Sequence, residues 1–151
     1  MFNGSYSNTI DEKGRVAIPA RFRDELRNAG EQGLMITGFE VSGVPCLEGF
    51  PAAGWQQLVS DLSSKMGAYS QSRVLFETIY VGGAQYCQPD KQGRVLLPPV
   101  LRTYAELKDN VTFVGVGRKF RLFSESGYQN VTQAFRALLR ENPNMFHDLG
   151  I

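Results

Sequence analysis

Apolar and polar positions alternate in short blocks along the first half of the chain, and this pattern predicts strands and helices of modest length. Alternation over 6–10 and 15–18 predicts two strands joined by a turn at 11–14. Pro19 suits the first turn of a short helix, and Gly30 lies just past its end. Residues 34–37 and 45–48 predict the strands of a hairpin. A longer helix follows, stopped by Gly67, with apolar residues at helical spacing: Trp55, Leu58, Val59, Leu62 and Met66.

The second half of the chain predicts the same order of elements. Residues 95–97 predict a strand, and Pro98 with Pro99 opens a short helix. Residues 111–117 and 120–123 predict a hairpin around Arg118 and Lys119. A final helix, capped by Ser124 or Ser126, has an apolar side made of Tyr128, Val131, Phe135, Leu138 and Leu139.

Two segments give a less definite pattern. Residues 73–81, which join the halves, fit a strand because they are rich in β-branched and aromatic residues. They also fit a helix, because Arg73 and Glu77 stand at i and i+4. The tail after Asn142 shows no periodicity, and we expect it to be mobile.

One block of sequence occurs twice. DEKGRVAIPARFR begins at Asp11, and DKQGRVLLPPVLR begins 79 residues later at Asp90. We also expect 34–37 to correspond to 113–116, and Trp55 to correspond to Tyr128. Two copies are too few for a solenoid and fit a pseudo-two-fold pair, as in a fused homodimer. The block aligns without a gap at Asp11, Gly14, Arg15, Val16, Ile18, Pro19, Phe22 and Arg23 with Asp90, Gly93, Arg94, Val95, Leu97, Pro98, Leu101 and Arg102.

Charge is concentrated in the repeated block. The whole chain of 151 residues has a formal net charge of +1, which argues against a uniformly basic surface. Each copy of the block carries net +2, so the rest of the chain carries net −3. A local basic patch is therefore compatible with the nearly neutral total.

The sequence offers little for catalysis, cofactors or membranes. No apolar run of about 18 residues or secretory signal is present, so we expect a cytoplasmic protein. Cys46 and Cys87 form no CxxC motif and are expected to be buried, reduced thiols. His147 is the only histidine, and neither metal-ligand spacing nor a nucleophile motif occurs. We therefore predict no enzyme activity, metal, cofactor or small-molecule substrate.

The repeated turns carry the candidate chemistry. Arg15 and Arg94 directly follow the turn residues Gly14 and Gly93. A guanidinium presents a planar fork of donors that fits phosphate oxygens or the O6/N7 edge of guanine. We predict that both arginines contact DNA bases or a groove. The predicted phosphate contacts are Lys13, Lys91, Arg21, Arg23 and Arg102.

Asp11 and Asp90 have two possible roles in these turns. They can form the turn by accepting backbone N–H groups, or they can orient the neighbouring arginine. A purely structural interpretation also stands, in which each turn closes a hairpin and its arginine pairs with its own aspartate. For Arg118, Lys119 and Arg121 we favour a solvated hairpin tip over DNA contact.

With both blocks in view, the chain resembles the MraZ family of bacterial regulators. The resemblance covers essentially the whole chain: Phe2, Gly4 and Tyr6, both blocks, the run GGAQYCQP before the second block, and VGVGRKFRLFS. It implies an α+β, swapped-hairpin, AbrB-like double-split β-barrel built from two internal repeats and flanked by helices. The repeats are expected at 1–81 and 82–142, with a tail at 143–151. Asn8 and Phe123 stand where family members often carry histidine and tryptophan.

The resemblance also implies a function. We expect a cytoplasmic, nucleoid-associated transcriptional repressor of the division and cell-wall gene cluster. It would bind direct repeats in double-stranded promoter DNA as a homo-oligomeric ring. The alternative is a ring-forming assembly or interaction protein whose Gly-Arg turns are structural or bind a protein partner. A steep loss of DNA affinity with salt would separate the two.

Overall fold

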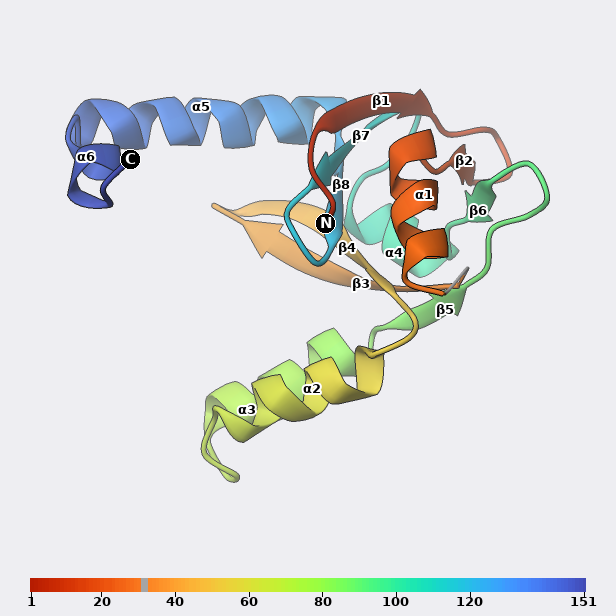
Figure 1. The fold of residues 1–151 in the computed structure, drawn as a ribbon, viewed down its shortest axis with the longest axis horizontal. Helices are drawn as coiled ribbons and strands as arrows, with labels where there is room; N and C mark the ends of the chain where they lie inside the picture. Colours follow the sequence, from red (N-terminus) through yellow and green to blue (C-terminus); the bar gives the residue numbers. More distant parts are fainter. Residues whose placement is uncertain (31–32) are drawn as a thin grey trace.

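The computed structural model describes residues 1–30 and 33–151 and shows an α+β protein with a six-stranded antiparallel sheet and a separate two-stranded ribbon (Figure 1). The strands are β1 (Ser5–Thr9), β2 (Arg15–Ala17), β3 (Leu34–Val41), β4 (Val44–Pro51), β5 (Gln85–Cys87), β6 (Arg94–Leu96), β7 (Asn110–Gly115) and β8 (Phe120–Ser124). The helices are α1 (Ala20–Asn28), α2 (Trp55–Ser64), α3 (Gln71–Leu75), the π-helix η1 (Phe76–Val81), α4 (Pro99–Tyr104), α5 (Glu125–Glu141) and α6 (Met145–Asp148).

The two repeats exchange strands. The large sheet has the order β1-β7-β8-β4-β3-β5, which is unchanged when the repeats are swapped and the order is reversed. The first strand of each repeat pairs with the hairpin of the other, β1 with β7 and β5 with β3. In the ribbon, β2 pairs with β6, and Val16 lies opposite its own counterpart Val95. A pseudo-two-fold axis therefore passes between these valines.

The core is centred on an aromatic cluster beneath the short helices. Phe22 of α1 packs its ring 5.3 Å from Phe2, 5.2 Å from Phe120 and 6.2 Å from Phe113, measured between ring centroids. These rings come from both repeats, and all four side chains are buried. Leu101, which corresponds to Phe22, is buried on α4. The apolar positions of the repeated block thus join the two halves into one core.

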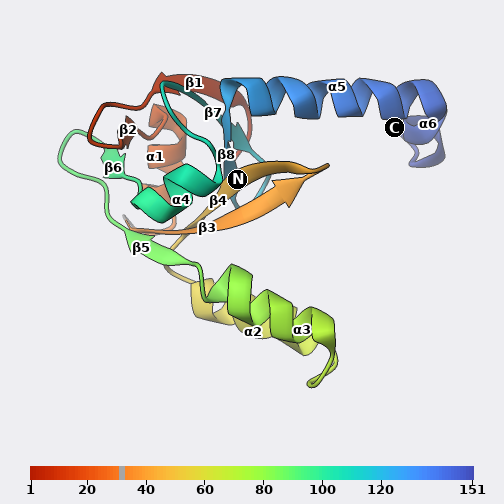
Figure 2. The same cartoon turned by 180° about the vertical axis from the view of Figure 1, so that it is seen from behind.

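Two helical arms extend from the sheet in different directions (Figures 1 and 2). The first arm contains α2, α3 and η1, so the segment 73–81 is helical and the strand interpretation is wrong. The expected ion pair forms, with Arg73 Nε donating to Glu77 Oε1 over 2.6 Å. The second arm is α5, whose N-cap is Ser124, followed by α6. The tail after Asn142 thus includes a short helix, and the ring of Phe146 lies 5.9 Å from that of Phe135.

Most elements expected in the described residues are present, with one shift in correspondence. Tyr6 pairs with Phe113, and its counterpart Gln85 pairs with Ile36. Residues 34–37 therefore correspond to 111–114, and the expected correspondence with 113–116 is wrong by two residues. The reason is a shorter helix in the second repeat, because α4 has 6 residues and α1 has 9. Among the helices of the described residues, none is long and apolar enough to cross a membrane.

Candidate nucleic-acid interface

The two-stranded ribbon formed by β2 and β6 brings the repeated arginines together. Val16 and Val95 are buried under the ribbon. Because side chains alternate along a strand, Arg15 and Arg94 lie on the opposite, outer face. Arg15 is opposite Leu96, and Arg94 is opposite Ala17. The outer face therefore carries two arginines in a diagonal arrangement across the pseudo-two-fold axis.

The first turn is closed by the carboxylate of Asp11. Its Oδ1 accepts hydrogen bonds from the backbone N–H groups of Lys13 and Arg15, each at 2.9 Å. The Gly14 N–H donates to the Asp11 carbonyl over 3.0 Å. Gly14 has φ 88°, a conformation that favours glycine over residues with a Cβ. The acid and the glycine of the repeated block thus determine the shape of this turn.

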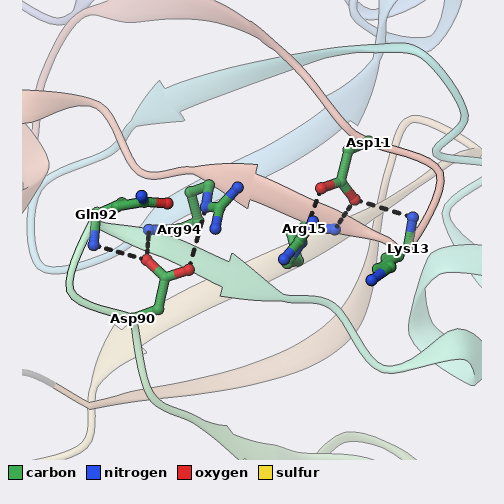
Figure 3. A network of polar contacts seen from close by, with 6 residues as sticks. All are labelled: Asp11, Lys13, Arg15, Asp90, Gln92 and Arg94. Carbon is green, nitrogen blue, oxygen red and sulfur yellow. Dashed lines mark hydrogen bonds and ion pairs between the residues drawn. The ribbon is translucent and has the colours of Figure 1, made fainter.

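The second turn repeats this geometry at Asp90 (Figure 3). Asp90 Oδ1 accepts from the backbone N–H groups of Gln92 at 2.9 Å and Arg94 at 3.0 Å. Gly93 has φ 77° and donates its N–H to the Asp90 carbonyl over 3.0 Å. The two turns lie at opposite ends of the ribbon (Figure 3).

Each arginine binds its own aspartate through one nitrogen only. Arg15 Nε donates to Asp11 Oδ2 over 2.8 Å, and Arg94 Nε donates to Asp90 Oδ2 over 3.1 Å. Within the described residues, the two terminal nitrogens of each guanidinium have no hydrogen-bond partner. The arginine side chains are 35% and 34% exposed, so these nitrogens can meet a ligand. The pairing fits the structural interpretation and also leaves a two-nitrogen fork available.

The aspartates are held in their charged form. The pKa of Asp11 is lowered, chiefly by the hydrogen bond from the Arg15 backbone N–H and then by the Arg15 side chain. The pKa of Asp90 is lowered in the same way, chiefly by the backbone N–H of Arg94. A charged carboxylate at Nε fixes the guanidinium at the turn. The aspartates therefore both form the turns and orient the arginines.

A second pair of arginines crosses between the repeats. Arg23, from the first repeat, packs over Gly93 of the second turn, where a Cβ would collide with its guanidinium. Arg102, from the second repeat, packs over Gly14 of the first turn, with its Nη1 2.6 Å from the position of such a Cβ. Each turn thus carries its own arginine and one from the other repeat.

The remaining predicted phosphate contacts are placed differently. Lys13 and Lys91 are exposed in the turns, but they are not counterparts, since Lys13 aligns with Gln92 and Lys91 with Glu12. Arg21 lines a separate hollow with Met1 and Asn3. The structure therefore gathers Lys13, Lys91, Arg15, Arg94, Arg23 and Arg102 at the turns and places Arg21 elsewhere.

Sequence reasoning missed a buried cluster around Glu48. This carboxylate is fully buried and lies 3.0 Å from Lys119 Nζ and 2.8 Å from Arg121 Nε. It also accepts a hydrogen bond of 2.6 Å from the Tyr80 hydroxyl. The expected solvated hairpin tip is therefore wrong for Lys119 and Arg121, which are about three-quarters covered, although Arg118 is exposed. Nothing in the sequence near Arg121 reveals a partner 73 residues away.

The Glu48 cluster lies on the same pseudo-two-fold axis as the valines. Glu48 and Arg121 face each other in the β4–β8 pair and occupy corresponding positions in the two hairpins. Burial, followed by the hydrogen bond to Glu48, raises the pKa of Tyr80 far above its ordinary value. Burial also raises the pKa of Cys46 to about 12 and that of Cys87 to about 11. Both cysteines are buried and free, as expected.

The outer face of the ribbon carries groups that suit contact with a nucleic acid. A B-DNA major groove, about 12 Å wide, admits a two-stranded β-ribbon. Arginine forks on its outer face match phosphate oxygens or guanine edges. Among residues 1–30 and 33–151, no group of three or more His, Cys, Asp or Glu could hold a metal ion.

The chain is similar to one family of known proteins over most of its length. Residues 1–76 and 80–145 match the family described as "MraZ protein, putative antitoxin-like". Proteins named transcriptional regulator MraZ are similar to it. The Roseiflexus castenholzii protein is 42% identical over 91% of this chain and 90% of its own. The Carboxydothermus hydrogenoformans protein is 39% identical over 93% of both chains. The Halothermothrix orenii protein is 33% identical over all of both chains. The solution structure of PHS018 from Pyrococcus horikoshii matches over 81% of this chain and 88% of its own, at 14% identity and a TM-score of 0.35.

Proposed function

The chain belongs to the MraZ family, and from this premise we propose that it regulates transcription by binding double-stranded promoter DNA. In this proposal it is a cytoplasmic, nucleoid-associated repressor of the division and cell-wall gene cluster. Arg15 and Arg94 contact the bases or the groove. Lys13, Lys91, Arg21, Arg23 and Arg102 contact phosphates.

The proposal rests on the outer face of the ribbon. Arg15 and Arg94 are anchored through Nε and keep two terminal nitrogens each without a partner in the described chain. An anchored guanidinium loses less side-chain entropy on binding than a freely moving one. The ribbon thus presents two pre-oriented forks at a spacing fixed by the Val16–Val95 pair.

The exchange of strands supports a finer assignment of the fold. We assign it to the swapped-hairpin, AbrB-like double-split β-barrels. The pairing of β1 with β7 and of β5 with β3 interleaves the two repeats as that fold requires. The repeat boundary remains proposed at 81/82, between η1 and β5.

Assembly into a ring would compensate for the low charge of one subunit. A chain with net charge +1 gains little from counterion release alone. Both arms carry exposed apolar side chains, Val74, Leu75 and Ile79 on the first, and Phe135, Leu138 and Leu149 on the second arm with its tail. Contacts between arms of neighbouring subunits would bury these side chains. Several ribbons on one DNA would then act together through effective concentration.

The proposed binding mode predicts direct repeats in the operator. Successive subunits of a ring would each read one repeat in the same orientation, so the spacing of the repeats must match the spacing of the ribbons. Moving one repeat by half a helical turn should weaken binding sharply. Equal affinity for the original and the shifted operator would contradict this mode.

The experiment that tests the function is a gel-shift titration on the upstream promoter DNA. Wild type, Arg15→Ala and Arg94→Ala are compared over a range of salt concentrations. Arg118→Ala is the control, because Arg118 is an exposed arginine outside the ribbon. We expect both ribbon variants to bind more weakly and with a smaller salt slope, and the control to bind like wild type.

Light scattering and thermal melting show whether each variant keeps the assembly and fold of wild type. If wild type binds no promoter DNA at any salt concentration, the regulator proposal fails. The alternative is then a ring-forming interaction protein whose Gly-Arg turns have a structural role.

A further inference from the structure

Each turn is bordered by a hollow, and the two hollows are built from corresponding residues. The second-turn hollow, of about 270 Å³, is lined by charged residues from both repeats, namely Arg23, Arg27, Asp90 and Lys91. The first-turn hollow, of about 720 Å³, is lined by the charged residues Asp11, Glu12, Arg102, Glu106, Lys108 and Asp109. The two ends of the ribbon therefore differ in the charged groups that surround them.

The two hollows carry opposite charge. The repeat keeps Arg23 as Arg102 and Asp90 as Asp11. In the same alignment, Lys91 of the second-turn hollow corresponds to Glu12 of the first. Arg27, four residues after Arg23, is matched by Glu106, four residues after Arg102. Counting the charged lining residues gives net +2 for the second-turn hollow and net −2 for the first-turn hollow.

Arg23, which lines the second-turn hollow, also has an unsatisfied donor. Arg23 Nε is buried and has no hydrogen-bond partner in the described chain. The carboxylate of Asp90 is already engaged by Arg94 Nε and by two backbone N–H groups. Arg27 pairs with Asp24, which lies outside the lining of the hollow. A guanidinium held in this way, beside the exposed Lys91, favours an incoming anion.

We propose that the second-turn hollow holds a phosphate of the DNA backbone more tightly than the first-turn hollow, where acidic residues weaken the phosphate contact of Arg102. This proposal rests on the proposed DNA-binding function. Arg27 joins Arg23 and Lys91 as a phosphate contact. The phosphate belongs to DNA because the hollow borders the turn that carries Arg94. A subunit whose two ends attract the backbone unequally binds the duplex in one preferred orientation. The charge difference thus explains how a pseudo-symmetric ribbon can read direct repeats.

The test neutralises each hollow and compares the two ends. The Lys91→Gln, Arg27→Gln double variant removes two cations from the second-turn hollow. The Glu12→Gln, Glu106→Gln double variant is the matched control at the corresponding positions. DNA affinity is measured by fluorescence anisotropy from low to moderate salt. We expect the first variant to lower the salt slope by about 0.9 for each phosphate that it no longer neutralises. The control should bind as tightly as wild type or more tightly.

A single charge reversal provides a second route if the double variant folds poorly. Glu12→Lys places a cation where the second turn has Lys91. The proposal predicts a steeper salt slope and tighter binding, because the net charge of the first-turn hollow rises from −2 to 0. Loss of binding by Glu12→Lys in a folded protein would overturn the proposal, as would equal salt slopes for the two double variants.

Two further results separate the possible failures. Inorganic phosphate added at constant ionic strength should leave DNA binding unchanged. If phosphate displaces DNA from wild type and not from the Lys91→Gln, Arg27→Gln variant, the second-turn hollow is a site for free phosphate. If Arg15→Ala and Arg94→Ala lose binding while both hollow variants bind like wild type, only the proposal for the hollow fails. If wild type ignores DNA, both proposals fail. Thermal melting confirms that each variant is folded.

Discussion

The ribbon turns and the Glu48 cluster use the same chemical groups and differ in what they leave available. In each turn, one aspartate holds one arginine through Nε, and the rest of the guanidinium has no partner in the described chain. In the Glu48 cluster, one buried carboxylate forms ion pairs with Lys119 and Arg121 and accepts a hydrogen bond from the hydroxyl of Tyr80. The ribbon arginines are about one-third exposed and can bind a ligand. Arg121 also donates through Nε alone in the described chain, but it is 24% exposed, lies over the ring of Phe39 and helps to neutralise a fully buried carboxylate.

The two regions also differ in how well their residues obey the pseudo-two-fold symmetry. At the ribbon, corresponding residues remain alike, with Val16 opposite Val95 and a similar turn on each side. At the other site, the corresponding residues Glu48 and Arg121 carry opposite charges. A symmetric dimer would place two like charges there, which is unfavourable in a buried position. Fusion of the two repeats in one chain permits this complementary pair.

Removal of both ribbon arginines should have the largest effect. Each arginine that forms a bidentate contact contributes about 1–3 kcal/mol, so Arg15→Ala with Arg94→Ala should weaken DNA binding by about 4 kcal/mol, roughly a thousandfold. The melting temperature should change little, because exposed ion pairs add little stability. Fluorescence anisotropy and thermal melting measure the two quantities. A loss of stability in place of affinity would reverse the roles assigned to the two regions.

Neutralising Glu48 should give the opposite result. Glu48→Gln leaves Lys119 and Arg121 partly buried without a charged partner. We expect the free energy of unfolding to fall by about 2 kcal/mol in denaturant titrations, somewhat less than for a fully buried pair. Below the unfolding transition, DNA affinity should match wild type. The control is Glu40→Gln, at an exposed position on β3, and it should change neither quantity.

The turn glycines should have an intermediate effect. Gly14→Ala and Gly93→Ala each force a Cβ into the left-handed region, at a cost of about 1–2 kcal/mol, and also against Arg102 or Arg23. Gly43→Ala is the matched control, because Gly43 has φ 79° and nothing within 4 Å of its Cβ position. Thermal melting should show a larger loss for the two turn variants than for Gly43→Ala. Equal losses of stability would mean that Arg102 and Arg23 move aside from the new Cβ atoms without destabilising the fold.

Acid titration should give the smallest effect. The folded-state pKa values of Asp11 and Asp90 lie below the ordinary value of 3.8. Their contribution to stability is therefore complete above that value and is lost as the pH falls through the lowered pKa. NMR titration of the carboxyl carbons measures this directly. In Arg15→Ala the pKa of Asp11 should rise only partly, because the backbone N–H is its largest cause. A full return to 3.8 would identify the side chain as the main cause.

The local elements could be predicted from the sequence because their determinants are local. The acid, glycine and arginine of each repeated block determine a turn and a strand start, and Pro19 and Pro98 mark where helices begin. The segment 73–81 is ambiguous in the sequence because its residue types favour a strand, whereas the spacing of Arg73 and Glu77 favours a helix. Its helical state is supported by a tertiary contact, the bond from Tyr80 to Glu48, as well as by the pair of Arg73 and Glu77.

Contacts between the repeats could not be predicted in this way. Arg23 meets Gly93, and Glu48 meets Arg121, across long stretches of sequence. These contacts depend on the exchange of strands between the repeats, which local patterns do not encode. The shift of 34–37 to 111–114 comes from the shorter helix α4, and it can be recognised only once the strands are paired.

Hydrogen exchange with and without promoter DNA tests most directly whether the ribbon turns, and not the Glu48 cluster, meet the nucleic acid. Mass spectrometry of peptic peptides suits an assembly of any size. We predict that DNA slows exchange in 11–17 and 90–96 and leaves 44–49 and 119–121 unchanged, with the protection absent in the Arg15→Ala, Arg94→Ala variant. Protection centred on 119–121, or equal protection of wild type and variant at the turns, would contradict the account.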